Sequence, residues 1–259
     1  MRTLRKTIRT ILLIIFIAGV GTCSYLVYEG YNMYKDAIEA VPIEDKVEEV
    51  RSKPGYTTID ELPDTYLEAI ISVEDHRFYS HFGIDLLATA RAAVNDIKAM
   101  SLIEGGSGIT QQLSKNLYFS QEKKFTRKIA EVFMALDFER EYTKDEILEL
   151  YVNSIFFGNN YYCVKDASMG YFGKLPKDMT DYEATLLAGI PNAPSAYALT
   201  VNPDLAGQRQ RQVINKMIKY EYLTEEEAEE ILNSKTPQQA EGVLNLQGGR
   251  ESWLVVLYE

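Results

Sequence analysis

Two glutamates in the sequence have the residue type for acid–base chemistry, and their expected surroundings differ. Read as a helix, residues 69–85 (AIISVEDHRFYSHFGID) place Glu74 near the middle of one helix face. The other side chains expected on that face are those of Leu67, Ile70, Ile71, Phe78 and His81. A buried ionised carboxylate without partners is costly, so Glu74 is either a catalytic group or a structural one satisfied by His76, Arg77 or a backbone N–H.

The second glutamate, Glu131, is expected beside cations. Arg127 and Lys128 precede it by one turn of a predicted helix, and Glu131 lies off the apolar face of that helix. That apolar face comprises Phe125, Ile129, Val132 and Leu136. Cations favour the ionised carboxylate and an apolar setting disfavours it, so the two glutamates should differ in protonation, as a pair that divides acid and base roles does. The alternative for Glu131 is a solvated ion pair of little energetic worth.

A glycine-containing loop followed by cationic residues predicts a binding site for phosphate groups. The loop GGSGITQQ offers backbone N–H groups and the side chains of Ser107, Gln111 and Gln112. The cations that follow are Lys115, Lys123, Lys124, Arg127 and Lys128. A solvated charge run is the ordinary explanation, but the formal net charge of −11 makes a local basic cluster notable and favours a pyrophosphate site. The acidic chain is a poor candidate for binding nucleic acid.

The first residues have the pattern of a membrane anchor. Residues 1–10 form a basic tail without an acid, and residues 11–28 are uncharged. As a helix, this apolar run would span about 27 Å of a bilayer core of about 30 Å. A cleaved signal peptide is the alternative, but the run exceeds the usual signal core and no clear small-x-small cleavage site follows. The basic flank predicts a cytoplasmic N-terminus, with the rest of the chain outside.

Helical periodicity dominates the remaining sequence, so the fold is expected to be mainly α. Residues 29–55 have the pattern of a juxtamembrane stalk, residues 56–233 that of one helical domain, and residues 234–259 form a tail without an assigned role. Cys23 lies in the apolar run and Cys163 in the domain, so neither a disulfide nor a zinc site is expected.

Five ordered motifs resemble those of the peptidoglycan glycosyltransferases, glycosyltransferase family 51. EDHRFYSHFG is similar to E-D-x-x-F-x-x-H-x-G, GGSGITQQ to G-G-S-T-x-T-Q-Q, and RKIAE to R-K-x-x-E. KDEILELYVN is similar to K-x-x-I-L-E-x-Y-x-N, and RQRQVI approximates R-R-x-x-V-L. Gly108 stands where the family usually has threonine, and Gln210 replaces an arginine of the last motif.

The resemblance implies a lysozyme-like, mainly α glycosyltransferase domain with a membrane-dipping jaw between Ile84 and Gly105. The implied reaction joins the disaccharides of lipid II into glycan strands and releases polyprenyl pyrophosphate. Glu74 would be the general base on the acceptor hydroxyl, and Glu131 would lie beside the donor pyrophosphate. Substrate-binding roles would fall on Asp75, Arg77, Phe78, His81, Ser107, Gln111, Gln112, Lys115, Lys123, Arg127 and Lys128.

The implied partners are lipid II, the growing glycan and the bacterial cell membrane, with other wall-synthesis proteins and a divalent metal, Mg²⁺ or Mn²⁺, left open. Two other functions compete. A non-catalytic, membrane-anchored scaffold for lipid-linked precursors would fit the departures at Gly108 and Gln210, because a fold alone does not determine function. A glycan-cleaving hydrolase would leave the cations unexplained. A penicillin-binding transpeptidase domain is not expected, because no K-T-G follows the S-x-x-K match at Ser120.

Overall fold

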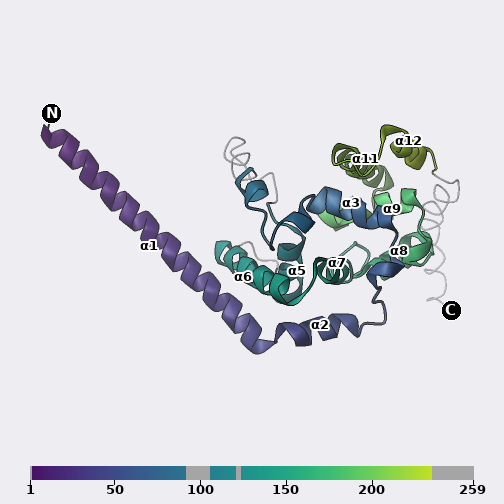
Figure 1. Ribbon diagram of the computed structural model, residues 1–259, viewed down its shortest axis with the longest axis horizontal. Coiled ribbons are helices and arrows are strands. Elements are labelled where there is room, and N and C mark those ends of the chain that lie inside the picture. The colour runs from purple at the N-terminus through teal and green to yellow at the C-terminus, as the bar shows by residue number, and fades with distance from the viewer. Residues whose placement is uncertain (1, 92–105, 121–123, 235–259) are drawn as a thin grey trace, which may run out of the picture.

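The computed structural model describes residues 2–91, 106–120 and 124–234 (Figure 1). The elements within these residues are helices without a strand, which confirms the mainly α expectation. The first of them, α1, is a single helix of 39 residues from Arg2 to Ala40. It is long and apolar enough to cross a membrane, and no part of its most apolar window is buried. Its N-terminal half stands clear of the other helices in Figure 1.

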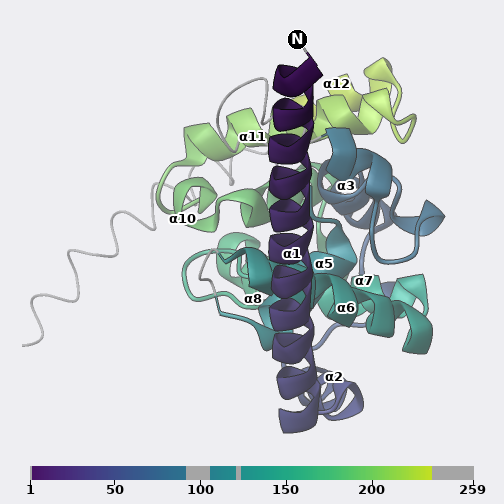
Figure 2. The ribbon, with the colours of Figure 1, turned by 90° about the vertical axis from the view of Figure 1, so that its left-hand side faces the viewer.

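The segment 29–55 differs from the expected stalk, because it is packed against the domain. α1 continues unbroken through its first part, and Figure 2 shows α1 crossing the face that carries α5 and α6. Pro42 then separates α1 from α2 (Ile43–Arg51), since proline has no N–H for a helix interior. α2 lies next to α7 (Lys144–Val152). Its apolar residues recur at helical spacing and are buried: Ile43, Val47 and Val50.

The helix expected around Glu74 is α3 (Asp64–Glu74), but it ends at Glu74 instead of continuing through His81. The next residue, Asp75, has extended backbone with φ −159° and ψ 76°. Its carboxylate accepts a hydrogen bond of 3.1 Å from the backbone N–H of Ile109, 34 residues further along the chain. This long-range bond favours a non-helical backbone at Asp75. Phe78 and His81 therefore do not lie on the helix face that periodicity predicted for them. A 3₁₀ turn, Phe78–Ser80, follows instead.

Three helices lie below α3 in Figure 1, namely α5 (Ile109–Tyr118), α6 (Phe125–Glu141) and α7. The expected GGSGITQQ loop is therefore partly helical, because its last four residues form the first turn of α5. The apolar face predicted for α6 is wrong. Phe125 is 70% exposed, and Ile129 lies against Gly30 of α1. The face that α6 buries instead carries Ala130, Glu131, Met134, Ala135 and Phe138.

The C-terminal helices form the other side of the domain. They are α8 (Val164–Phe172), α9 (Asp181–Gly189), α10 (Pro194–Tyr197), α11 (Pro203–Lys219) and α12 (Glu225–Asn233). Short 3₁₀ turns lie at Ile59–Glu61, Pro176–Asp178 and Ile190–Asn192. α9 is buried along its whole length from Tyr182 onward and packs on both α3 and α11. α3 is therefore held between helices on two sides.

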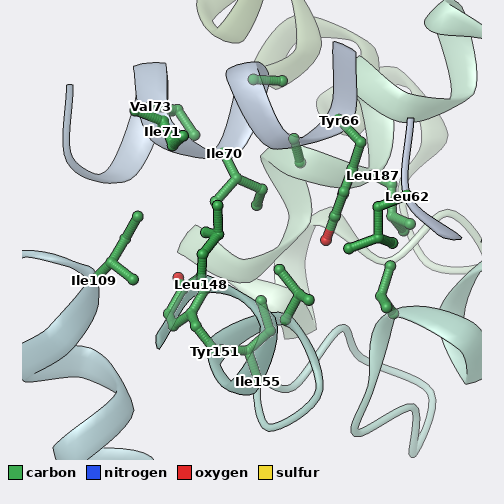
Figure 3. Close-up of a cluster of buried hydrophobic side chains, with 14 of the residues drawn as sticks. Leu62, Tyr66, Ile70, Ile71, Val73, Ile109, Leu148, Tyr151, Ile155 and Leu187 are labelled. Carbon is green, nitrogen blue, oxygen red and sulfur yellow. The ribbon is translucent and has the colours of Figure 1, made fainter. Parts of the chain in front are cut away.

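The core beneath α3 is drawn in Figure 3. Ile70 of α3 lies above Leu148 and Tyr151 of α7, whereas Tyr66 of α3 lies beside Leu62 and Leu187 (Figure 3). The side chains of Tyr66, Ile70, Leu148 and Tyr151 have no exposed surface. Burial of each large apolar side chain contributes about 1.5–3 kcal/mol, so this cluster holds α3 firmly on α7. The C-terminal end of α3, with Glu74, is thereby fixed relative to both α5 and α7.

Candidate active site

Glu74, the last residue of α3, has one bonded and one unbonded carboxylate oxygen. Gln112 on α5 donates a hydrogen bond of 2.8 Å from Nε2 to Glu74 Oε2. The other oxygen, Oε1, is shielded from solvent and meets no hydrogen-bond donor among the described residues. An unsatisfied buried oxygen is unfavourable for folding, so its retention is typical of a group that completes its bonding with a ligand.

Tyr151 determines which end of the Gln112 amide faces Glu74. The Tyr151 hydroxyl donates to Gln112 Oε1 at 3.2 Å, which leaves the amide NH₂ for the carboxylate. Burial, and after it the charge of Glu74, raises the pKa of Tyr151 well above its ordinary value, so the phenol stays a donor. The tyrosine of KDEILELYVN thus supports the site, a role that no sequence signal had given it.

Glu131 is buried, with 1% of its surface exposed, which corrects the expectation that it lies off the core. Arg127 Nε lies 2.8 Å from Glu131 Oε1, and Lys128 Nζ lies 2.8 Å from Oε2. Lys128 also donates a hydrogen bond to the Ser107 hydroxyl, just before α5. The glutamate therefore holds two cations in place at the N-terminal end of α6.

Lys115 on α5 is a third cation near the two glutamates. It follows Gln112 by one turn of α5, so the two side chains project from the same helix face. Burial lowers the pKa of Lys115. Four charged side chains also act on it, in decreasing order Glu131, Arg127, Lys128 and Glu74. Both glutamates are thus within electrostatic reach of one lysine. Below, the cation cluster means Lys115, Arg127 and Lys128.

Asp75 and His81 are bonded to each other near the end of α3 and the start of α5. His81 Nε2 lies 3.0 Å from both carboxylate oxygens of Asp75, which is 6% exposed. The same carboxylate accepts from the N–H of Ile109, the first residue of α5. Both residues were expected to bind substrate, and that role stays a prediction; the contacts described here join the two residues to each other. They fix the junction at which Glu74 meets Gln112.

Because Gly108 has no side chain, it leaves room for the Asp75 carboxylate beside the start of α5. Glycine at this position, where the family usually has threonine, therefore has a packing explanation. A Cβ at this position would lie 2.2 Å from Asp75 Oδ2, whereas the backbone φ of −77° suits any residue. We predict that Gly108→Ala displaces Asp75 from Ile109 and lowers the free energy of unfolding by about 1–3 kcal/mol. Thermal unfolding of the full chain measures this.

Gly207→Ala is the matched control for that prediction. Gly207 lies inside α11, and a Cβ there would meet nothing within 4 Å. Alanine is the better helix former by about 0.5–1 kcal/mol, so this variant should be slightly stabilised. An unfolding midpoint for Gly108→Ala at or above that of the wild type would contradict the clash.

Three further residues expected to bind substrate are engaged within the protein. Phe78 has no exposed surface and belongs to the core. Arg77 places its guanidinium on Asp85, with Nε 2.8 Å from Oδ2. Gln111 is 2% exposed, and its side-chain oxygen accepts from the N–H of Gly108 at 3.4 Å. These internal contacts do not test the substrate-binding roles, which stay predictions; Arg77 and His81 also line a cavity with Ser80, Ile84, Asp85, Leu86 and Leu87.

Lys123 and most of the expected jaw, residues 92–105, lie outside the described residues. At the start of the jaw, Leu86 and Leu87 are 74% and 65% exposed. Across the described ranges, no three His, Cys, Asp or Glu side chains gather as metal ligands would. The divalent metal left open by the sequence stays untested.

α11 supplies a cation that the motifs did not single out. Lys216 Nζ donates to the carbonyl of Val73 at 3.1 Å, one residue before Glu74, where a cation favours the C-terminal end of a helix. Gln210, by contrast, is 1% exposed between α11 and α9. Its amide donates to the Tyr182 carbonyl at 2.9 Å and to the Thr185 hydroxyl at 3.0 Å. This departure from the last motif therefore concerns helix packing.

Known proteins are similar to this chain over most of its length. Penicillin-binding protein 1A of Neisseria gonorrhoeae is 43% identical over 180 residues, which cover 70% of this chain and 23% of that protein. Penicillin-binding protein 1F of Bacillus subtilis is 44% identical over 171 residues, 66% of this chain and 24% of that protein. The crystal structure of penicillin-binding protein 1A from Haemophilus influenzae covers 70% of this chain and 17% of that one, with 20% identity and a TM-score of 0.42.

This chain spans about a quarter of the length of the curated relatives that it matches. The family described as Transglycosylase matches residues 43–218, from the start of α2 to the end of α11. That range contains all five motifs and both glutamates. The resemblance is thereby confirmed, and the chain belongs to the transglycosylase family of peptidoglycan glycosyltransferases.

Proposed function

We propose that this chain polymerises lipid II into β(1→4)-linked glycan strands. The observation that supports this most is the Glu74 oxygen that accepts no hydrogen bond from the described residues, on a carboxylate within electrostatic reach of Lys115. A general base needs an oxygen free to take a proton, and a pyrophosphate leaving group needs cations already in place. The described residues offer both on neighbouring helices.

The proposed reaction is a single displacement. Glu74 Oε1 takes the proton of the acceptor's 4-hydroxyl while that oxygen bonds to the anomeric carbon of the donor. The bond from this carbon to the pyrophosphate oxygen breaks, and polyprenyl pyrophosphate leaves with the bonding electrons. The cation cluster stabilises the charge that develops on the leaving group. Attack opposite the leaving group converts the α-linked donor into a β-linked product.

The same proposal places the chain in the bacterial cell membrane as a single-pass protein. α1 is apolar and unburied over the segment that would cross the bilayer, and four cations precede its uncharged run. This pattern favours a cytoplasmic N-terminus, with residues 56–233 outside the cell as the glycosyltransferase domain. Lipid II and the lipid-linked growing glycan would then lie in the same membrane as the enzyme.

Product analysis tests the proposal. The full-length chain in vesicles that contain lipid II should form a polymer on a gel, release polyprenyl pyrophosphate, and be inhibited by a phosphoglycolipid that mimics the donor. Lipid II binding without polymer would favour the scaffold function. Cleavage of preformed glycan without polymerisation would favour the hydrolase.

The lowered pKa of Lys115 predicts an alkaline limit to donor binding. Because burial lowers this pKa, Lys115 loses its proton at a lower pH than an ordinary lysine, whose pKa is about 10.4. Binding of the anionic donor mimic should therefore weaken as pH rises, beginning below that value. Lys115→Arg stays charged and should shift this loss upward by about one pH unit or more. The measurement is the affinity for the mimic between about pH 7 and pH 10.5.

Lys165→Arg is the control for this pH profile. Lys165 lies on α8, where its ammonium is 3.5 Å from the carbonyl of Pro54. The control should reproduce the wild-type profile. If the Lys115→Arg profile coincided with those of the wild type and of Lys165→Arg, Lys115 would not contribute to the loss of binding at high pH.

A further inference from the structure

α1 runs without a break from the apolar segment to the helix that carries two of the clustered cations. The uncharged run ends at Tyr28, and α1 continues to Ala40. Gly30, two residues after Tyr28, packs against α6. At a rise of 1.5 Å per residue, this contact lies only about 3 Å beyond the end of the apolar run.

Gly30 lets the two helices approach closely. A Cβ at this position would lie 2.6 Å from Ile129 Cβ and 2.8 Å from the Thr126 carbonyl oxygen. A larger residue would therefore force α1 away from the first turns of α6. By contrast, a Cβ at Gly19 or Gly21 would meet nothing within 4 Å. The absence of a side chain matters for packing at Gly30 and not at those two positions.

Aromatic residues continue the contact after Gly30. Tyr31 and Tyr34 pack on Phe133, with ring centroids 5.3 and 5.7 Å apart. The Tyr34 hydroxyl also donates to the carboxylate of Asp137. Going along α1 from residue 30 to 34, the partners on α6 advance from 126 to 137, so the two helices run in the same direction.

This parallel arrangement places the N-terminal end of α6 nearest to the point at which the apolar run ends. Arg127 and Lys128 lie in the first turn there. Phe125 beside them is 70% exposed, as an apolar residue at a bilayer edge would be. The phosphates of membrane lipids occupy the polar layer of roughly 5–8 Å just outside the hydrocarbon core.

We propose that the α1–α6 contact sets the depth of the cation cluster, so that Arg127 and Lys128 stand at the level of the lipid phosphates. The inference rests on the proposed function, because the pyrophosphate of a lipid-linked donor lies in this layer. A continuous docked helix acts as a spacer of fixed length between the apolar run and α6. The cluster then meets the donor pyrophosphate without lifting the lipid out of the bilayer.

Inserting seven helical residues after Tyr28 tests the depth. The insertion Glu-Ala-Ala-Ala-Lys-Ala-Ala lengthens the spacer by about 10 Å but turns α1 by only about 20°. The α1–α6 contact and the fold of the domain should persist. We expect polymerisation in lipid II vesicles to fall by about tenfold or more, with binding of the donor mimic in detergent unchanged. The matched control carries the same insertion after Thr10, before the apolar run.

A depth measurement tests the proposal without catalysis. A fluorophore on Phe125→Cys, in a Cys23→Ala background that leaves only the buried Cys163, should be quenched by quenchers attached to lipid headgroups. The insertion after Tyr28 should reduce this quenching, and the insertion after Thr10 should not. Equal quenching in all three proteins would overturn the proposal. Absence of polymer from every protein, with the quenching pattern intact, would instead contradict the proposed function alone.

Gly30→Val tests the contact at unchanged helix length, with Gly21→Val as the control on the same helix. Quenching of the label and polymerisation in vesicles should fall for Gly30→Val only. Equal behaviour of the two variants would show that the close approach at Gly30 does not set the depth. The insertion variants keep the proposal testable if Gly30→Val does not fold.

Discussion

Replacing Glu74 by glutamine is expected to lower the rate of glycan polymerisation by about 10²–10⁴-fold. Glutamine keeps the size of the side chain and its oxygen can still accept the Gln112 hydrogen bond, but its amide cannot take a proton from the acceptor hydroxyl. The initial rate of polymer formation from lipid II, by the full-length chain in vesicles, measures the effect. Affinity for the donor mimic should change little, because the cation cluster is untouched.

Glu68→Gln is the matched control on the same helix. Glu68 lies six residues before Glu74 on α3, and its carboxyl group lies near Asp64 and Asp181. This variant should polymerise at the wild-type rate. If Glu74→Gln also retained that rate, Glu74 would be a structural glutamate, and Glu131 would become the first candidate for the base.

Glu131→Gln should lose both stability and activity. The substitution leaves Arg127, whose side chain is 14% exposed, and Lys128 without their buried counter-charge. Breaking a buried ion pair costs about 3 kcal/mol or more, which lowers the unfolding midpoint of a domain of this size by about 6–12 °C. Polymerisation should fall by about 10²–10³-fold, because the cations are no longer held ready for the leaving group.

Glu183→Gln is the control that separates the loss of stability from the loss of activity. Glu183 on α9 is 2% exposed and lies 2.9 Å from Lys174 Nζ, so it is another buried glutamate paired with a lysine. Its substitution should lower the unfolding midpoint but leave the rate per folded molecule unchanged. Differential scanning fluorimetry and the polymerisation rate below the midpoint supply both quantities. A Glu131→Gln protein that unfolds like the wild type would contradict the buried pairing of Glu131.

Local periodicity predicted the helices that carry both glutamates, because the apolar spacing in α3 and α6 is regular. It could not predict that α3 ends at Glu74. The partner that draws Asp75 out of the helix, Ile109, is 34 residues away and leaves no local trace. Phe78 and His81 were consequently assigned to a helix face that does not exist. Long-range capping of this kind depends on the tertiary fold.

The orientation of α6 was mistaken for a related reason. Spacing shows which residues share a helix face, but not what that face will meet. Ile129 and Phe133 contact α1, so the side of α6 that looked polar turns toward the domain interior with Glu131. The burial of this glutamate is tolerable because its counter-ions, Arg127 and Lys128, come from the same helix.

The motifs likewise did not show which of their residues contact the proposed base and which hold the helices in place. Asp75 and Gln112 lie in the quoted motifs, but one joins two helix ends and the other bonds directly to Glu74. The positions of the two residues in the sequence do not distinguish these roles, because both side chains are polar and both lie close to a helix end. Asp75 directly follows α3, and Gln112 lies in the first turn of α5. The side-chain contacts separate them.

The bond from Gln112 makes the two oxygens of Glu74 chemically unequal. With Tyr151 holding the amide, Oε2 accepts one hydrogen bond, whereas Oε1 accepts none from the described residues. In the proposed reaction Oε1 is therefore the oxygen assigned to take the acceptor's proton in each cycle. Strand growth then requires Oε1 to give that proton up to water or to a neighbouring group before the next sugar is added, so deprotonation of a single defined atom recurs between successive additions.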